Sequence, residues 1–157
     1  MARWLLAMVV LMGMTGVASA QSQFQSPSFP RAALDVVTAD GRHHPFQIEE
    51  AVTEAQLFQG LMFRRTLERN TGMLFDFGTP RQVAMWMKNT LVPLDMLFIR
   101  ADGHIAYIEE YAVPGTLQPR GPAEPVLGVL EVAAGTARRL GLKPGDIVQH
   151  PMFNRGR

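Results

Sequence analysis

The sequence predicts a mostly β, β-rich α+β domain, folded as a compact, partly open β-barrel or sandwich of seven or eight short strands with one or two short helices. Short segments in which apolar residues alternate with polar ones, or run together, dominate the chain. An Asp-Gly pair, which favours a tight hairpin turn, separates two such segments at residues 40–41 and again at 102–103. Only residues 53–63 and 134–140 have features typical of a helix.

The expected strands are short and lie between turns that contain Gly, Pro or Asp. They are expected at residues 33–38, 44–52, 72–78, 83–88, 94–100, 104–112, 126–132 and 147–150. The first helix is predicted to begin at Thr53, because threonine is a favourable N-cap residue and an acidic residue follows it. Residues 113–125 contain four prolines and predict a long surface loop, and such loops often carry function.

The first twenty residues predict a secretory signal peptide. Arg3 precedes an apolar run at 4–12, and the small residues at 18–20 form a cleavage site of the Ala-x-Ala type. The apolar run is shorter than the roughly 20 residues that span a bilayer. We therefore expect cleavage after Ala20, no membrane span in the mature chain, and a periplasmic or secreted location. An uncleaved N-terminal anchor is the alternative.

Four regions follow from these patterns: the signal peptide at 1–20, a flexible leader at 21–32, one globular domain at 33–152 and a C-terminal tail at 153–157. The leader is rich in Gln, Ser and Pro and has no periodicity. Cleavage would leave 137 of the 157 residues, which suits one domain. Because the chain has no cysteine, packing rather than disulfides must hold this domain together.

Composition argues against several classes of function. Without the signal peptide, 14 basic residues balance 14 acidic ones, which argues against a nucleic-acid binder or a polybasic membrane binder. Every serine lies in the signal peptide or leader and cysteine is absent, so the domain has no serine or cysteine nucleophile. No Gly-rich phosphate loop is present. The four histidines lack zinc-ligand spacing, so neither a metal site nor a cofactor is expected.

Five short motifs stand out from the surrounding sequence. They are GLMFR at 60–64, GMLF at 72–75, MWMKNT at 85–90, PLD at 93–95 and VLE at 129–131. Together, in this order, they resemble the family called domain of unknown function 192, over about residues 34–150. The resemblance implies a small β-barrel-like domain that is commonly exported, and it implies no established activity.

The motif around Trp86 contains most of the candidate site residues. Strand alternation would place Met85 and Met87 on the core side and Trp86 with Lys88 on the other. The ligand-binding candidates are the aromatic and polar residues of the motifs: Trp86, Lys88, Asn89, Thr90, Asp95, Glu131 and Arg64. The structural alternative is that Asn89 and Thr90 only shape a turn.

Three of the charged candidate residues are expected to form ion pairs. Lys88 is one of only two lysines beside 13 arginines, and Asp95, seven residues later, is its expected partner, in a pair that is structural or catalytic. Glu131 lies in an otherwise apolar strand and needs a partner, for which Lys88 or Arg64 would serve.

These observations lead to one principal hypothesis and three alternatives. The principal hypothesis is a non-catalytic exported module that binds a small polar ligand, a glycan or an envelope protein through residues 86–95 and the 113–125 loop. The first alternative is a carboxylate-based hydrolase or lyase that pairs Glu131 with Asp95 or Asp76. The second is a Met and Trp site for monovalent copper, which core packing of the methionines opposes. The third is a purely architectural role for the motifs.

Overall fold

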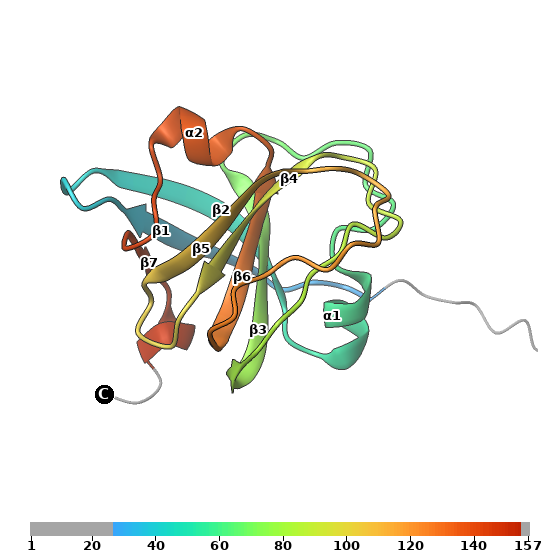
Figure 1. The fold of residues 1–157 in the computed structure, drawn as a ribbon, viewed down its shortest axis with the longest axis horizontal. Helices are drawn as coiled ribbons and strands as arrows, with labels where there is room; N and C mark the ends of the chain where they lie inside the picture. The colour runs from blue at the N-terminus through green and yellow to red at the C-terminus, as the bar shows by residue number, and fades with distance from the viewer. Residues whose placement is uncertain (1–26, 155–157) are drawn as a thin grey trace, which may run out of the picture.

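Seven strands form a single curled sheet in the order β5-β4-β6-β3-β2-β1-β7 (Figure 1). The computed structural model describes residues 27–154, so the predicted signal peptide, most of the leader and the last three residues lie outside the described part. In chain order the elements are β1 Arg31–Val37, β2 His43–Ala51, α1 Glu54–Gln59, β3 Thr71–Arg81, β4 Leu94–Ile99, β5 Ile105–Ala112, β6 Val126–Ala133, α2 Thr136–Leu140, β7 Ile147–Gln149 and the 3-10 helix Pro151–Asn154. No helix in the described part is long and apolar enough to cross a membrane.

The order of the strands places β6 at the centre of the sheet. It pairs antiparallel with β3 on one side and with β4 on the other. Beyond β3, the parallel strand β2 follows, and α1 lies in the crossover between these two strands. All six residues of β4 and seven of the eight residues of β6 are buried. Because both faces of these strands are covered, their sequences are apolar runs rather than alternating patterns.

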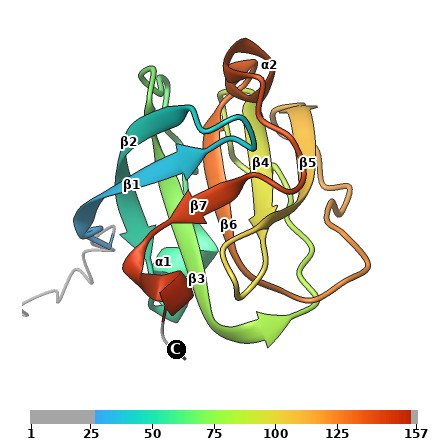
Figure 2. The same ribbon diagram turned by 90° about the vertical axis from the view of Figure 1, so that its left-hand side faces the viewer.

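The last strand closes most of the gap between the two ends of the sheet (Figure 2). β7 pairs with β1, and it also lies beside the start of β5. There the Ile105 N–H donates to the Asp146 carbonyl at 2.8 Å, and the Val148 N–H donates to the Gly103 carbonyl at 2.8 Å. The curled sheet therefore confirms the predicted mostly β, partly open barrel.

Two hydrophobic cores lie on opposite faces of the central strands. One is enclosed by the curl of the sheet and by α2, and includes Leu97, Leu130 and Val132. The other lies beneath α1 and the connections that precede β4 and β6, and includes Phe75 and Met96. Successive residues of a strand point to opposite faces. The buried apolar residues of β3, β4 and β6 are therefore divided between the two cores.

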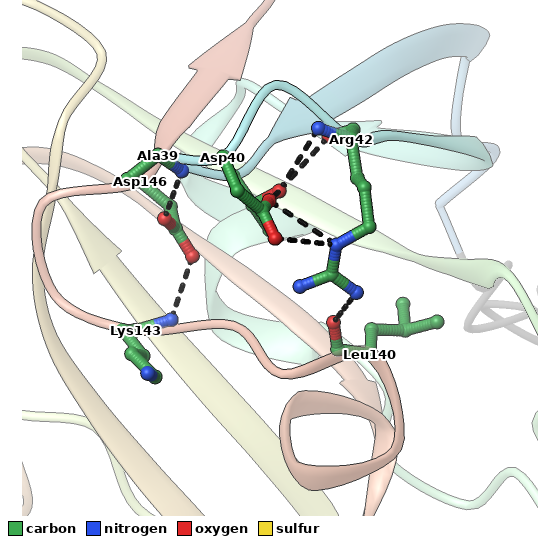
Figure 3. A network of polar contacts seen from close by, with 7 residues as sticks. Ala39, Asp40, Arg42, Leu140, Lys143 and Asp146 are labelled. Carbon is green, nitrogen blue, oxygen red and sulfur yellow. Dashed lines mark hydrogen bonds and ion pairs between the residues drawn. The ribbon is translucent and has the colours of Figure 1, made fainter.

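A buried carboxylate connects the first hairpin to the C-terminal part of the chain (Figure 3). Asp146 accepts hydrogen bonds from the Ala39 N–H at 2.9 Å and the Lys143 N–H at 2.7 Å. Beside it, Arg42 pairs with Asp40 at 2.9 Å and donates to the Leu140 carbonyl at 3.2 Å. These contacts hold the β1–β2 turn against the segment between α2 and β7.

The described part differs from the predicted elements at the N-terminal end of the domain, at the end of α1 and at the C-terminus. β1 begins at Arg31, and the Gln56 side chain donates to the Ser28 carbonyl at 2.6 Å, so the end of the predicted leader contacts the domain. The helix ends at Gln59 rather than residue 63, because Gly60 has a φ of 47°, which is not helical. A side chain at this position would also be too close to Phe75, since its Cβ would lie 2.8 Å from the ring. Phe153, assigned to the tail, is buried in the enclosed core.

The strand expected at 83–88 is not part of the sheet. Only one isolated bridge forms in this segment, between Met85 and Arg120 of the 113–125 loop. The predicted alternation of burial still holds for Val83 and Met87, which are buried, and for Trp86, which is exposed. Packing against the second core therefore sets the burial of this segment without a continuous ladder of hydrogen bonds.

Candidate functional site

Glu131 occupies an unusual position for a carboxylate, at the middle of the central strand. In β6 it lies between Met73 of β3 and Met96 of β4, its partners in the two adjoining registers. Both methionines are fully buried, and only 4% of Glu131 is exposed. A carboxylate flanked by two thioether side chains is removed from water, and its ionised form is disfavoured there.

The Glu131 carboxyl group has no partner within residues 27–154, since neither a hydrogen bond nor an ion pair reaches it there. Burial alone raises its pKa to about 8. The two partners expected from the sequence are engaged elsewhere. Arg64 forms an ion pair with Glu49, and the Lys88 ammonium lies 5.3 Å from the centre of the Trp86 ring. The expectation that Lys88 or Arg64 would pair with Glu131 is therefore wrong.

The side chain of Glu131 lines a small pocket between α1 and the segment that follows β3. We call it the Glu131 pocket. Its lining residues, from four separate parts of the chain, are Leu57, Phe58, Gln59, Gly60, Leu61, Met62, Phe75, Met85, Trp86, Lys88, Thr90 and Glu131. Its cavity volume is about 30 Å³. Four of the seven predicted site residues therefore lie around one pocket: Trp86, Lys88, Thr90 and Glu131.

Two aromatic side chains among the lining residues are exposed to solvent. Phe58 of α1 is 65% exposed and Trp86 is 45% exposed, although Lys88 lies over the tryptophan ring. Exposed aromatic groups beside a recess are costly to leave in water and often mark a binding surface. The pocket thus combines an aromatic rim with a buried polar base.

The turn at Asn89 and Thr90 fixes the position of the lysine and tryptophan. Asn89 has a φ of 54°, and its carbonyl accepts from the Phe63 N–H at 2.8 Å. Thr90 is buried, and its hydroxyl donates to the Lys88 carbonyl at 3.3 Å. These contacts support the architectural role expected for both residues, and Thr90 lines the pocket as well.

Main-chain hydrogen bonds join the two segments expected to carry function. The Met85 N–H donates to the Arg120 carbonyl at 2.7 Å, and the Arg120 N–H donates back at 2.9 Å. The Met87 N–H donates to the Thr116 carbonyl at 2.9 Å, and its carbonyl accepts from the Gly115 N–H at 3.0 Å. The 113–125 loop is therefore hydrogen-bonded through its main chain to the segment that contains Trp86.

Asp95 lies on the opposite face of the sheet from Glu131. It pairs in register with Val132 of the enclosed core, whereas its neighbour Met96 pairs with Glu131. Its carboxylate is fully buried and accepts from the Tyr111 N–H at 3.0 Å and the Ala137 N–H at 2.8 Å. The predicted Lys88–Asp95 pair and the predicted Asp95–Glu131 acid and base pair are both wrong.

The second predicted acid and base pair fails for the same geometric reason. Asp76 follows Phe75, which lines the Glu131 pocket, and successive strand residues point to opposite faces. Asp76 therefore lies on the side of the sheet away from Glu131. Among the described residues that line the pocket, Glu131 is the single carboxylate. Glycoside hydrolysis by paired carboxylates needs two acids facing one cleft, and this pocket does not provide them.

Arg64 belongs to a separate groove on the surface. Its guanidinium lies 5.7 Å from the centre of the Phe29 ring, and it lines the groove together with Arg31, Gln47 and Glu49. The groove has both signs of charge, and it does not share Arg64 with the Glu131 pocket. The structure therefore does not bring Arg64 together with the other predicted site residues.

A family profile matches most of the chain. The profile of the DUF192 family, described as "Uncharacterized ACR", matches residues 35–150. The chain belongs to the DUF192 family. This result confirms the resemblance inferred from the sequence, and it supplies no activity.

Two solved structures share the fold of this DUF192 chain. A protein from Sinorhizobium meliloti 1021, described as a "putative transcription regulator", is 48% identical with a TM-score of 0.79, over 82% of this chain and 99% of that one. A protein of unknown function from Novosphingobium aromaticivorans DSM 12444 is 40% identical with a TM-score of 0.73, over 76% and 85% of the two chains. No curated protein matches at significant similarity.

Phe58 and Met62 are among the lining residues of the Glu131 pocket that were not proposed as site residues from the sequence. Leu57 and Phe58 are adjacent apolar residues of the helix, and the sequence does not show which of them is exposed. In the structure Leu57 packs against the second core, whereas Phe58 is 65% exposed. Met85 packs against the second core, as predicted, and it also lines the Glu131 pocket together with the exposed Trp86. No group of three or more His, Asp or Glu residues suited to a metal ion occurs within residues 27–154.

Proposed function

We propose that this DUF192 chain is an exported, non-catalytic binding module that takes a small polar ligand or one end of a glycan in the Glu131 pocket. The observation that carries the proposal is the Glu131 carboxyl group, buried without a protein partner at the base of a recess. A buried polar group without a partner costs about 1–3 kcal/mol. A ligand that supplies the missing hydrogen bond recovers this free energy.

The absence of a second acid in the pocket supports binding rather than hydrolysis. The pocket offers one carboxyl group, one ammonium, one hydroxyl and one side-chain amide, from Glu131, Lys88, Thr90 and Gln59. Two of these are held by other contacts, since Lys88 lies over Trp86 and Thr90 bonds to the main chain. Export, to the periplasm or beyond the cell, is part of the proposal and rests on the signal-like pattern at residues 1–20.

The proposal is tested by thermal shift of the purified protein against a library of envelope glycans, small metabolites and metals. A ligand at a hundredfold excess over its Kd stabilises by about 2.7 kcal/mol, which is readily measured in a domain of this size. Lys88→Ala is the test variant, and Lys143→Ala is its control, because it removes the other lysine at an exposed site. A compound that stabilises the wild type and Lys143→Ala but not Lys88→Ala supports the pocket. Equal stabilisation of all three excludes it.

A second candidate function, binding of monovalent copper, is favoured by one observation. The thioether side chains of Met62 and Met85 both line the Glu131 pocket beside Trp86. Thioethers are suitable ligands for monovalent copper. A titration with this ion that changes tryptophan fluorescence in the wild type, and not in Met85→Leu, supports the candidate. No change in the wild type excludes it.

A further inference from the structure

The size of the Glu131 pocket limits which part of a ligand can enter it. A cavity of about 30 Å³ has room for one or two groups the size of a water molecule, and not for a ring. Only a short arm of a larger ligand therefore reaches Glu131. The bulk of that ligand has to remain at the mouth, against Phe58 and Trp86, which are the exposed aromatic residues of the lining.

The walls and base of the pocket select the chemistry of that arm. Met62, Met85 and Phe75 present apolar surface, which suits a methylene group. At the base, a carboxyl group that keeps its proton both donates and accepts a hydrogen bond, and a hydroxyl group does the same. Burial favours this protonated form of Glu131 at neutral pH.

Charged arms fit the same site less well. The Lys88 ammonium lines the pocket and would repel an entering ammonium group. Lys88 would attract an entering carboxylate, but at the base that group would lose its hydration beside a carboxyl group that offers one proton at most. A neutral hydroxymethyl group therefore matches the walls and the base together.

The rim selects the part of the ligand that stays outside. Aromatic faces pack well against the apolar C–H face of a pyranose ring. Lys88 lies at the same rim, and its ammonium is a hydrogen-bond donor suited to ring hydroxyls. The Glu131 pocket thus combines three features that suit a sugar residue: exposed aromatic side chains, a hydrogen-bond donor beside Trp86, and a recess for one short hydroxylated arm.

We infer that the Glu131 pocket takes the exocyclic hydroxymethyl group of a hexopyranose residue, with the sugar ring packed on Trp86 and Phe58 at the mouth. This inference rests on the proposed binding function and specifies its ligand. It assigns Phe58 and Met62 to the site beside the residues found from the sequence. It also predicts that pentopyranoses, which lack the hydroxymethyl arm, are poor ligands.

The test compares sugars that differ only in this arm. Methyl glucoside, galactoside and mannoside are paired with methyl xyloside, arabinoside and lyxoside of matching configuration. Binding to the purified protein is measured by tryptophan fluorescence and by NMR shifts, with short oligomers of the same sugars where affinity is low. At least one hexoside is expected to bind ten times more tightly than its matching pentoside, because a site that hydrogen-bonds a hydroxyl group rejects ligands lacking it.

Two variants at Glu131 connect this preference to the carboxyl group. Glu131→Gln retains a donor and an acceptor and should keep the hexoside preference. Glu131→Leu removes both, and the ratio of hexoside to pentoside affinity should fall to about one. Circular dichroism and thermal melts check that each variant is folded, and the ratio remains interpretable for any variant that is.

The outcomes separate this inference from the function on which it rests. Equal affinity for hexosides and pentosides, or no binding of any sugar, overturns the hexopyranose assignment. If another small polar compound then binds and is lost in Glu131→Leu, the binding function stands with a different ligand. If no compound in the library binds, both the assignment and the proposed function are overturned.

Discussion

Asp95 and Glu131 lie on adjacent strands, one register position apart, yet their surroundings are opposite. Asp95 is fully buried and accepts two main-chain hydrogen bonds, one from Tyr111 and one from the first turn of α2. Glu131 is buried to nearly the same extent and has no such donor within residues 27–154. Successive positions along β4 and β6 thus place one carboxyl group in the enclosed core and the other at the base of a pocket.

This difference shows how a buried carboxyl group is assigned a role. Main-chain donors that surround a carboxylate satisfy it permanently, so its removal damages the fold. A carboxyl group that faces a recess without donors weakens the fold and is available to a ligand. Burial and sequence context alone do not distinguish a structural carboxylate from one that is available to a ligand. The presence or absence of main-chain N–H donors around the carboxyl group does.

A large loss of stability at neutral pH is expected from replacing Asp95, the carboxylate that main-chain donors surround. Asp95→Ala leaves the buried N–H group of Ala137 and the partly buried N–H group of Tyr111 without an acceptor. Each such group costs about 1–3 kcal/mol, so the variant should lose about 3 kcal/mol of unfolding free energy. Urea denaturation measures this loss. A loss below 1 kcal/mol would contradict the architectural role of Asp95.

Glu131, which has no hydrogen-bond donor within residues 27–154, should make the free energy of unfolding depend on pH. The pKa of Glu131 is raised from 4.5 to about 8, so between these pH values the unfolded chain is ionised while the folded chain keeps its proton. The contribution of Glu131 to stability is therefore largest below about pH 4.5 and falls with rising pH, by about 1.4 kcal/mol per pH unit at most, until it levels above pH 8.

Glu131→Gln isolates this contribution, because glutamine has nearly the same shape and does not titrate. The difference in unfolding free energy between the variant and the wild type should change in favour of the variant from pH 5 to pH 8. Chemical denaturation across this range measures it. A difference that does not vary with pH would show that Glu131 is ionised in the folded protein.

A smaller effect on stability is expected at the rim of the pocket. Trp86→Ala removes an exposed aromatic side chain and should change the unfolding free energy by less than about 1 kcal/mol. It should nevertheless abolish binding of any ligand that wild type holds in the Glu131 pocket. Tyr107→Ala is the matched control, since Tyr107 is an exposed aromatic residue of β5 outside the pocket. Loss of binding in both variants would argue against a local role for Trp86.

The smallest effect should come from a carboxylate that is neither buried nor aimed into the pocket. Glu124 forms an exposed ion pair with Arg100 at 2.7 Å. Exposed pairs of this kind contribute little to stability. Glu124→Ala should leave the denaturation midpoint where it is, and it serves as the baseline for Asp95→Ala and Glu131→Gln. A clear shift in the denaturation midpoint of this variant would show that the ion pair contributes more to stability than an ordinary surface pair does.

Much of the fold was predictable because its signals are local. The Asp-Gly pairs lie in the β1–β2 and β4–β5 turns, and Thr53 caps α1 with a capping box completed by Gln56. The parallel pairing of β2 with β3 left no local signal, because it depends on where α1 returns the chain. The strand assigned to 83–88 failed because alternating burial occurs there without sheet pairing.

The sequence indicated which residues belong to the candidate site, but not which of them lie on the same face of the sheet. Trp86, Lys88, Thr90 and Glu131 were selected from their residue types and do line one pocket. The separation of Asp95 from Glu131 depends on the register of β4 against β6, and a shift of one residue would reverse it. A single sequence does not specify that register.

The position of β7 has a consequence for how this protein behaves when it is concentrated. An open sheet presents unpaired N–H and carbonyl groups along its outer strands, which act as templates for other chains. Here the start of β5 is occupied by the segment around β7, and the rest of that strand carries Glu109 and Glu110. Charge and pairing together leave little free edge for strand addition. The architecture should therefore resist aggregation through its sheet edges without the aid of a disulfide bond.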